Sequence, residues 1–152
     1  MAKQLKKTPL NHIHHELGAK MVEFAGFEMP VSYAGVNEEH INVRKNIGLF
    51  DVSHMGEFFI TGREAEDLLQ KVTTNDVSKL YNGKAQYTCM PNKENGIVDD
   101  FILYRIHAEK YMMVANAANI EKDYNWIVKH NVFDAKVNNQ SDEYSLLAIQ
   151  GP

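Results

Sequence analysis

The sequence predicts an α+β fold in which an antiparallel sheet is flanked by helices. From residue 56 onward, short apolar runs bounded by turn residues alternate with two segments of helical spacing, in the order strand, helix, three strands, helix, strand. Of the 152 residues, 44% are hydrophobic and 24% are charged, which are the values of an ordinary globular chain. The chain therefore has enough hydrophobic residues to form a packed core.

The first 50 residues contain two short predicted helices. Thr8 and Pro9 predict a helix start, because threonine can cap free N–H groups and proline suits the first helical position, and Gly18 predicts the end. Residues 20–33 are expected to be extended or looped. Residues 37–47 are expected to form the second helix, with acidic residues in its first turn.

The remaining elements follow an order related to the ferredoxin-like plan. A turn over residues 91–96 closes a hairpin, and a last apolar run over residues 144–149 is expected to be a buried strand. The other expected strands are 57–61, 85–90, 97–106, 111–115 and 132–137, and the expected helices are 63–72 and 118–130.

Composition excludes several classes of function. The 16 Lys and Arg against 20 Asp and Glu give a net charge of −4 with no basic block, which argues against nucleic acid or an anionic membrane as partner. The apolar runs fall far short of the roughly 20 residues of a membrane span. Cys89 is the single cysteine, so no internal disulfide is expected, and we expect a cytoplasmic location.

The hairpin holds the best candidate for chemistry, the adjacent Asp99 and Asp100. Neighbouring strand residues point to opposite faces, so the two carboxylates cannot act as a close pair. Asp100 shares its face with Val98, Ile102 and Tyr104, and partial desolvation there would suit a base or a charge stabiliser. The alternative from residue type alone is an aspartate that closes the hairpin by bonding to the backbone or to a lysine.

The histidines give a weaker signal. His12 and His15 lie on one face of the first helix, whereas His14 points away, and no cysteine or acidic residue stands at a typical ligand spacing. We therefore expect no metal site. His54 is interpreted as a hydrogen-bonded structural residue, and Cys89 as a small buried hydrophobe.

Seven segments carry a more specific signature. They are TPL (8–10), GAKMVEFAGFEMP (18–30), GLFDVSHMG (48–56), GKAQY (83–87), NGIVDD (95–100), NA (116–117) and AIQGP (148–152). In order and spacing they closely resemble the aminomethyltransferase, or T-protein, of the glycine cleavage system. Phe27 stands where that family commonly has tryptophan, and Asn95 where glycine is common.

The resemblance implies a reaction of glycine catabolism and one-carbon metabolism. A lipoyl group on the carrier H-protein presents an aminomethyl group, tetrahydrofolate takes its carbon, and methylenetetrahydrofolate, ammonia and dihydrolipoyl H-protein result. Tetrahydrofolate is then the cosubstrate, and the H-protein and folate are the partners. The resemblance requires no metal.

The resemblance also assigns roles to particular residues. The family's catalytic aspartate matches Asp100, which would hydrogen-bond the folate pterin and assist attack by its nitrogen. Met55, Tyr87, Tyr104 and Asn116 match positions that line the family's folate site. Met55 and the two tyrosines would offer apolar and aromatic surface to the pterin, and Asn116 would offer a polar contact.

The family's three-domain fold implies a division of this chain. Residues 1–50 would start the folate-binding first domain, residues 51–140 would form a ferredoxin-like second domain, and residues 141–152 would return to the first domain. We thus expect an N-terminal fragment, truncated at its end and inactive by itself.

Two related functions remain as alternatives. One is the folate domain of a demethylating dehydrogenase, and the other is a folate-binding relative without transferase activity. The intact segments at 51–56 and 99–100 favour the transferase.

Overall fold

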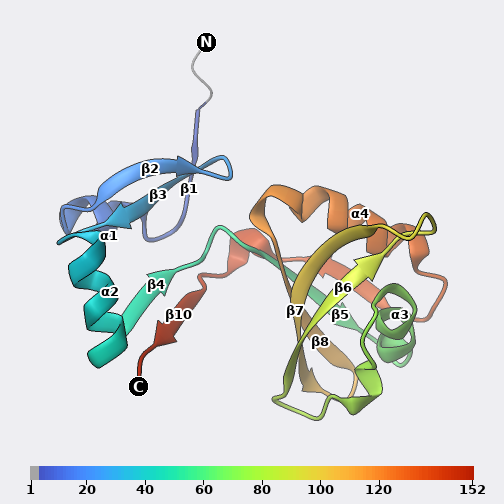
Figure 1. Cartoon of the computed structure of the whole chain (residues 1–152). Coiled ribbons are helices and arrows are strands. Elements are labelled where there is room, and N and C mark those ends of the chain that lie inside the picture. Colours follow the sequence, from blue (N-terminus) through green and yellow to red (C-terminus); the bar gives the residue numbers. More distant parts are fainter. Residues whose placement is uncertain (1–3) are drawn as a thin grey trace. The chain divides into compact units, whose positions relative to one another are not determined.

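The computed structural model describes residues 4–152. The chain forms two compact units, each with its own set of elements (Figure 1). The first unit extends to His54 and includes Tyr144–Pro152, and the second unit is Met55–Glu143.

The first unit contains two small sheets and two helices. In its three-stranded sheet, of order β1-β3-β2, β1 is parallel and β2 antiparallel to β3. Its second sheet pairs β4 with β10 in antiparallel fashion, so the end of the chain packs into the first unit. The elements are β1 (Lys6–Lys7), α1 (Asn11–Glu16), β2 (Lys20–Phe24), β3 (Phe27–Ser32), α2 (Val36–Lys45), β4 (Gly48–Asp51) and β10 (Leu147–Gln150).

Two sequence predictions for this unit, the helix start and the buried last strand, need correction. The first helix begins at Asn11, and Thr8 does not cap it, because the threonine hydroxyl donates to the Asp51 carboxylate instead. Residues 20–33, expected to be extended or looped, contain the extended hairpin β2–β3, which has a register shift between Lys20 and Met21 and a turn with positive φ at Ala25 (50°) and Gly26 (83°). The last strand is not buried, since Ile149 is 68% exposed.

The second unit is built on one five-stranded antiparallel sheet of order β6-β7-β8-β5-β9. Four of these strands, in the order β9-β5-β8-β7 with two crossover helices, follow the ferredoxin-like plan, and β6 adds an edge strand. The elements are β5 (Gly56–Thr61), α3 (Ala65–Val72), β6 (Ala85–Pro91), β7 (Ile97–His107), β8 (Lys110–Ala115), α4 (Ile120–His130) and β9 (Lys136–Asn139); single 3₁₀ turns lie at Val77–Lys79, Ala117–Asn119 and Ser141–Glu143.

The core of the second unit lies between its helices and one face of its sheet. Alternate residues of the strands point toward the helices, and α3 contributes a stripe at helical spacing. The fully buried side chains include Phe58, Ile60, Leu68, Leu69, Leu103, Tyr111, Met113 and Ile127. We call this the helix face of the sheet, and its reverse the open face.

The last predicted strand of this unit was misplaced. Residues 131–135 form a loop rather than a strand, because the Asn131 side chain donates to the Ala135 carbonyl and accepts from the Phe133 N–H. Pairing with β5 begins only at Lys136. Side-chain hydrogen bonds of asparagine often replace strand pairing in this way.

No helix within residues 4–152 is long and apolar enough to cross a membrane.

Candidate functional site

The β6–β7 hairpin places the two adjacent aspartates on opposite faces of the sheet. Asp100 is paired with Cys89 and Asp99 with Met90. The register then shifts, so that Pro91 pairs with Ile97. This shift is a β-bulge that leaves one extra residue, Val98, on β7 beside the turn. From Asp99 to Arg105 the alternation of faces is regular.

Asp100 lies half-buried on the open face. The Tyr87 hydroxyl donates a short hydrogen bond of 2.6 Å to Asp100 Oδ2. The same hydrogen bond raises the pKa of the Tyr87 phenol, because ionisation would place two negative charges side by side. Tyr87 is 61% exposed, so this pair of side chains is accessible from solvent.

Asn116 joins the two aspartates. It directly follows β8, and its Nδ2 donates to Asp99 Oδ1 at 3.1 Å and to the Asp100 carbonyl at 2.9 Å. Both acceptors are oxygens without a hydrogen to give, so the NH₂ group must face them. The two amide hydrogens are therefore used, and Oδ1 is left as the unused polar atom.

Asp99 lies on the helix face and is only 8% exposed. Burial by itself would raise the pKa of its carboxyl, but hydrogen bonds from Asp123, Asn116 and Asn119 outweigh burial and hold the pKa below its usual value. Asp123, in the first turn of α4, is fully buried, and burial together with Asp99 holds its pKa well above the usual range.

The other two predicted folate-site residues lie on neighbouring strands of the same sheet. Tyr104 is four residues beyond Asp100 on β7 and shares the open face. Met55 precedes Gly56, which pairs with Ala115 at the end of β8, so it lies beside the strand end that carries Asn116. The structure thus joins Tyr87, Asp100 and Asn116 by hydrogen bonds. Tyr104 lies further along the same face of the sheet, and Met55 lies beside the strand end that carries Asn116.

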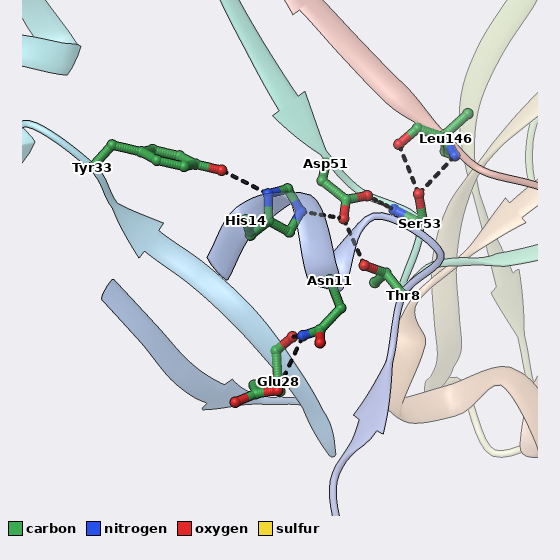
Figure 2. A network of polar contacts seen from close by, with 8 residues as sticks. All are labelled: Thr8, Asn11, His14, Glu28, Tyr33, Asp51, Ser53 and Leu146. Atoms are coloured by element: carbon green, nitrogen blue, oxygen red, sulfur yellow. Dashed lines mark hydrogen bonds and ion pairs between the residues drawn. The ribbon is translucent and has the colours of Figure 1, made fainter. Parts of the chain in front are cut away.

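The first unit contains a second polar cluster, which sequence reasoning did not foresee (Figure 2). His14 Nε2 lies 2.8 Å from Asp51 Oδ2, and the Tyr33 hydroxyl lies 2.7 Å from His14 Nδ1. The Thr8 hydroxyl donates to the same Asp51 oxygen, and the Ser53 N–H donates to Oδ1. The Asp51 side chain is 1% exposed.

The chemistry of this cluster fixes its hydrogen positions. The ionised Asp51 carboxylate can only accept, so His14 Nε2 carries a hydrogen, and in the Nε2–H tautomer Nδ1 accepts from the Tyr33 hydroxyl. Burial would raise the pKa of Asp51, but the hydrogen bonds from His14, Ser53 and Thr8 lower it instead. The histidine thus connects a surface tyrosine to a buried carboxylate.

The structure gives two of the histidines acidic partners that spacing along the sequence did not reveal. His14 does have an acidic partner, 37 residues away, and His15 Nε2 lies 3.4 Å from Glu28. Within residues 4–152 no group of three or more His, Cys, Asp or Glu side chains is arranged to hold a metal ion. His54 is 8% exposed and packs edge-on against Phe24 at 5.4 Å, and burial lowers the pKa of its imidazole.

Two buried carboxyl groups of the second unit also escaped sequence reasoning. Glu57 on β5 is 1% exposed, and burial raises its pKa to about 7. Asp123 falls between Ile120 and Ile127 at helical spacing, and this position on the apolar stripe of α4 was a readable signal of burial. Glu57, the second residue of β5, carried no comparable signal.

The chain has a mixed α/β fold, and its sequence matches a known protein family. The chain matches the family described as "GCVT N-terminal domain" over residues 10–152, and it belongs to this family.

Particular relatives carry the resemblance further. The chain is 62% identical to the aminomethyltransferase of Flavobacterium psychrophilum and 55% identical to that of Phocaeicola vulgatus, over 97% of its own length in both cases. Its structure is similar to that of glycine cleavage system aminomethyltransferase T from Bartonella henselae, with a TM-score of 0.92 and 38% identity over 98% of this chain. The chain spans 41% of the length of each of these proteins. The resemblance to the glycine cleavage aminomethyltransferase is confirmed.

Proposed function

We propose that this chain supplies the catalytic aspartate and part of the folate site of a glycine cleavage aminomethyltransferase. The enzyme would take the aminomethyl group from lipoyl H-protein and give methylenetetrahydrofolate, ammonia and dihydrolipoyl H-protein. The location that we propose is the cytoplasm. The observation that carries the proposal is the hydrogen bond from the Tyr87 hydroxyl to the Asp100 carboxylate on the open face of the sheet, with the Asn116 amide donating to the main-chain carbonyl of Asp100.

Asp100 is suited to its role by what surrounds it. A half-buried carboxylate held by a tyrosine hydroxyl can stabilise positive charge or accept a proton at a pterin nitrogen. Tyr87 and Tyr104 offer aromatic surface on the same side of the sheet, which suits a flat heterocycle. Asn116 adds a fixed polar atom at the end of β8.

The domain assignment is part of the same proposal. Residues 1–50 and 141–152 would belong to the folate-binding first domain, and residues 51–140 would form the second. Because the chain spans 41% of the relatives' length, we propose that it is inactive by itself and acts within a longer enzyme.

The test uses a chimera in which this chain replaces the matching segment of the Flavobacterium psychrophilum enzyme, to which it is 62% identical. We expect tetrahydrofolate-dependent release of ammonia from aminomethylated H-protein. Asp100→Asn should lower kcat by about 10²-fold or more, the usual contribution of a positioned acid or base. Cys89 is paired with Asp100 across the hairpin. The substitution Cys89→Ser is therefore the matched control and should leave kcat unchanged.

Two outcomes would contradict the proposal. One is a chimera that folds but releases no ammonia, and the other is an equal, mild loss in Asp100→Asn and Cys89→Ser. The 152-residue chain by itself, not fused to the rest of the enzyme, should show no turnover in the same assay.

A further inference from the structure

The first unit has almost no apolar core of its own. Within residues 4–152, Met29 is its only buried hydrophobic side chain, and every other buried hydrophobic residue belongs to the second unit. None of the residues of α2 is buried. The side chains that the first unit does bury are mostly polar, and they include Thr8, His14 and Ser53 of the cluster around Asp51. Because buried apolar surface supplies most of the stability of a folded unit, the first unit lacks a large part of what normally holds a domain together.

The apolar side chains that could form such a core line an open cavity instead. The cavity has a volume of about 480 Å³ and lies between α2, the end of β3 and β4. Val36 and Val43 stand two helical turns apart on its α2 wall, and Ile47 and Leu49 continue the apolar wall into β4. The side chains of Val36, Ile47 and Leu49 are between 62% and 68% exposed. We call this cavity the α2 groove.

The carboxylates beside the α2 groove already have hydrogen-bond partners. Glu39 Oε1 accepts from the N–H groups of Tyr33 and Gly35, at 2.7 and 2.9 Å. Asp51 accepts from the three donors of its cluster. Neither carboxylate requires a cation from a ligand, and the surface that the groove leaves uncovered is largely apolar. This pattern suits the apolar side chains of a polypeptide better than a small polar ligand.

The sheet that borders the α2 groove is also incomplete. Among the residues that the structure describes, β4 and β10 pair only with each other, so each strand has an edge without a strand partner. A two-stranded sheet by itself is only marginally stable. On β10, Leu147 and Ile149 are 44% and 68% exposed. A partner that adds a strand and covers these side chains would complete the sheet and the groove together.

The last residues of the chain lie at the rim of the α2 groove, beside the C-terminal end of α2 (Figure 1). Gly151 is packed so closely against the Asn46 carbonyl and against Ile47 that a Cβ atom at this position would collide with them. The family match is to an N-terminal domain, and the chain spans 41% of the Flavobacterium psychrophilum relative. Most of the remaining length of that relative therefore lies beyond the position of Pro152, and its polypeptide continues from the rim of the groove.

We propose that the α2 groove and the free edges of β4 and β10 form a docking surface for the remainder of the aminomethyltransferase, and that this remainder binds there even as a separate polypeptide. The remainder is defined as the part of the Flavobacterium psychrophilum enzyme that follows the position matched by Pro152. The identity of this partner rests on the proposed function. The partner contributes apolar side chains to the groove and a strand to the sheet, and the first unit becomes more stable as the partner concentration rises.

The first test measures binding without folate. The tagged 152-residue chain and the remainder are co-expressed, so that neither has to fold alone, and they should co-purify as a 1:1 complex. The double variant Ile47→Glu and Leu49→Glu should weaken the complex about tenfold or more, as measured by its dissociation on dilution. Both positions are exposed, so this variant should keep the NMR spectrum of a folded chain. The control Val132→Glu changes an exposed residue of the second unit, 74% exposed, and should leave the affinity within about twofold.

Three outcomes of this test would overturn the proposal. One is a tagged chain that purifies without the remainder, and another is equal affinity in the groove variant and the wild type. The third is a dimer of the 152-residue chain that the groove variant abolishes and the remainder does not displace, because the groove would then take a second copy of the chain.

The second test follows hydrogen exchange of the backbone amides. In the free chain, the amides of α2 should exchange about tenfold or more faster than those of β5 and β8, because no core covers them. In the complex they should slow by about tenfold or more, and the groove variant should lose this protection. Equal exchange of α2 in the free and the bound chain would contradict the proposal.

The third test uses activity to separate this proposal from the proposed function. The two-chain complex should release ammonia with tetrahydrofolate, and its activity should fall on dilution, whereas the activity of each fused chimera molecule should not. The groove variant should shift the dilution midpoint about tenfold to higher concentration with the same maximal rate, and Asp100→Asn should lower the maximal rate without shifting the midpoint. An active fused chimera without a two-chain complex contradicts only the docking of a separate chain. A complex that forms while the fused chimera is inactive contradicts only the proposed function.

Discussion

In the first unit, the buried Asp51 carboxylate accepts hydrogen bonds from Thr8, His14 and Ser53. In the second unit, the equally buried Glu57 carboxyl has no hydrogen-bond donor within residues 4–152. Burial pushes both pKa values upward, yet the pKa of Asp51 ends below its usual value and that of Glu57 rises to about 7. The number of donors around a buried acid, rather than its depth, therefore decides whether it is ionised at neutral pH.

The largest expected effect in this comparison comes from Asp51→Asn. The amide presents hydrogens where His14, Thr8 and Ser53 also present hydrogens, so at least one buried donor loses its acceptor. We expect a loss of about 3–5 kcal/mol in the free energy of unfolding of the first unit, because two or more hydrogen bonds to a charged acceptor, each worth about 1.5–3 kcal/mol, are weakened. Urea titration with NMR signals of that unit measures it.

The matched control is Glu16→Gln, an exposed acid at the end of α1. Wild-type stability from Asp51 should be complete above its unfolded-state pKa and should fall as the pH drops through its lowered folded-state pKa. If Asp51→Asn and Glu16→Gln unfolded at the same urea concentration, the comparison between the two units would fail.

The next largest effect is expected for Glu57→Gln, and its sign is opposite. The folded state keeps a proton on Glu57 that the unfolded state releases, so the free energy of unfolding should fall as the pH rises from about 4.5 to about 7. Glu57→Gln removes this slope and should stabilise the second unit by about 2 kcal/mol at pH 8. Thermal unfolding at several pH values measures it, with the exposed Glu94→Gln as control.

A smaller effect is expected for Tyr33→Phe, which removes the hydroxyl that donates to His14 Nδ1. The loss should be about 0.5–1 kcal/mol, because Tyr33 is 43% exposed and water can replace it in part. Nitrogen-15 NMR of His14 should still show the hydrogen on Nε2. A change of tautomer would mean that Tyr33, rather than Asp51, orients the ring.

The smallest effect is expected for Arg63→Gln. Arg63 Nη2 lies 2.8 Å from Asp134 Oδ2, but the two side chains are 80% and 65% exposed. An ion pair in water is screened, so stability should stay within experimental error of the wild type, and added salt should remove any difference. A clear loss of stability would show that the exposed Arg63–Asp134 ion pair stabilises the fold although it is not buried.

The local sequence pattern was enough to predict most helices and strands and to assign residues to the two faces of the sheet. Strand alternation correctly separated Asp99 from Asp100, and the apolar stripe correctly predicted α3. Local pattern failed where a distant residue decides the outcome. Thr8 was expected to cap a helix, but Asp51, 43 residues away, takes its hydroxyl. Tertiary hydrogen bonds of this kind override local propensity.

The candidate site shows the same limit. The pairing of Tyr87 with Asp100 follows from the hairpin, which is a local structure. The pairing of Asp99 with Asp123 depends on how α4 packs across the sheet, and no spacing along the chain encodes it. The resemblance to a family assigned the open-face residues, whereas the carboxyl pair behind them required the structure.

The bulge at Val98 determines how this hairpin can tolerate changes of length. It absorbs one extra residue on the turn side of Asp99, and the pairing from Asp99 to Arg105 stays regular. Insertions or deletions among residues 91–98 can therefore be taken up without changing which aspartate faces α4. A single insertion between Asp100 and Leu103 would instead exchange the faces of everything on one side of it. Length variation in related chains should be confined to the turn, which makes the turn the place to attach a tag or a fluorescent label.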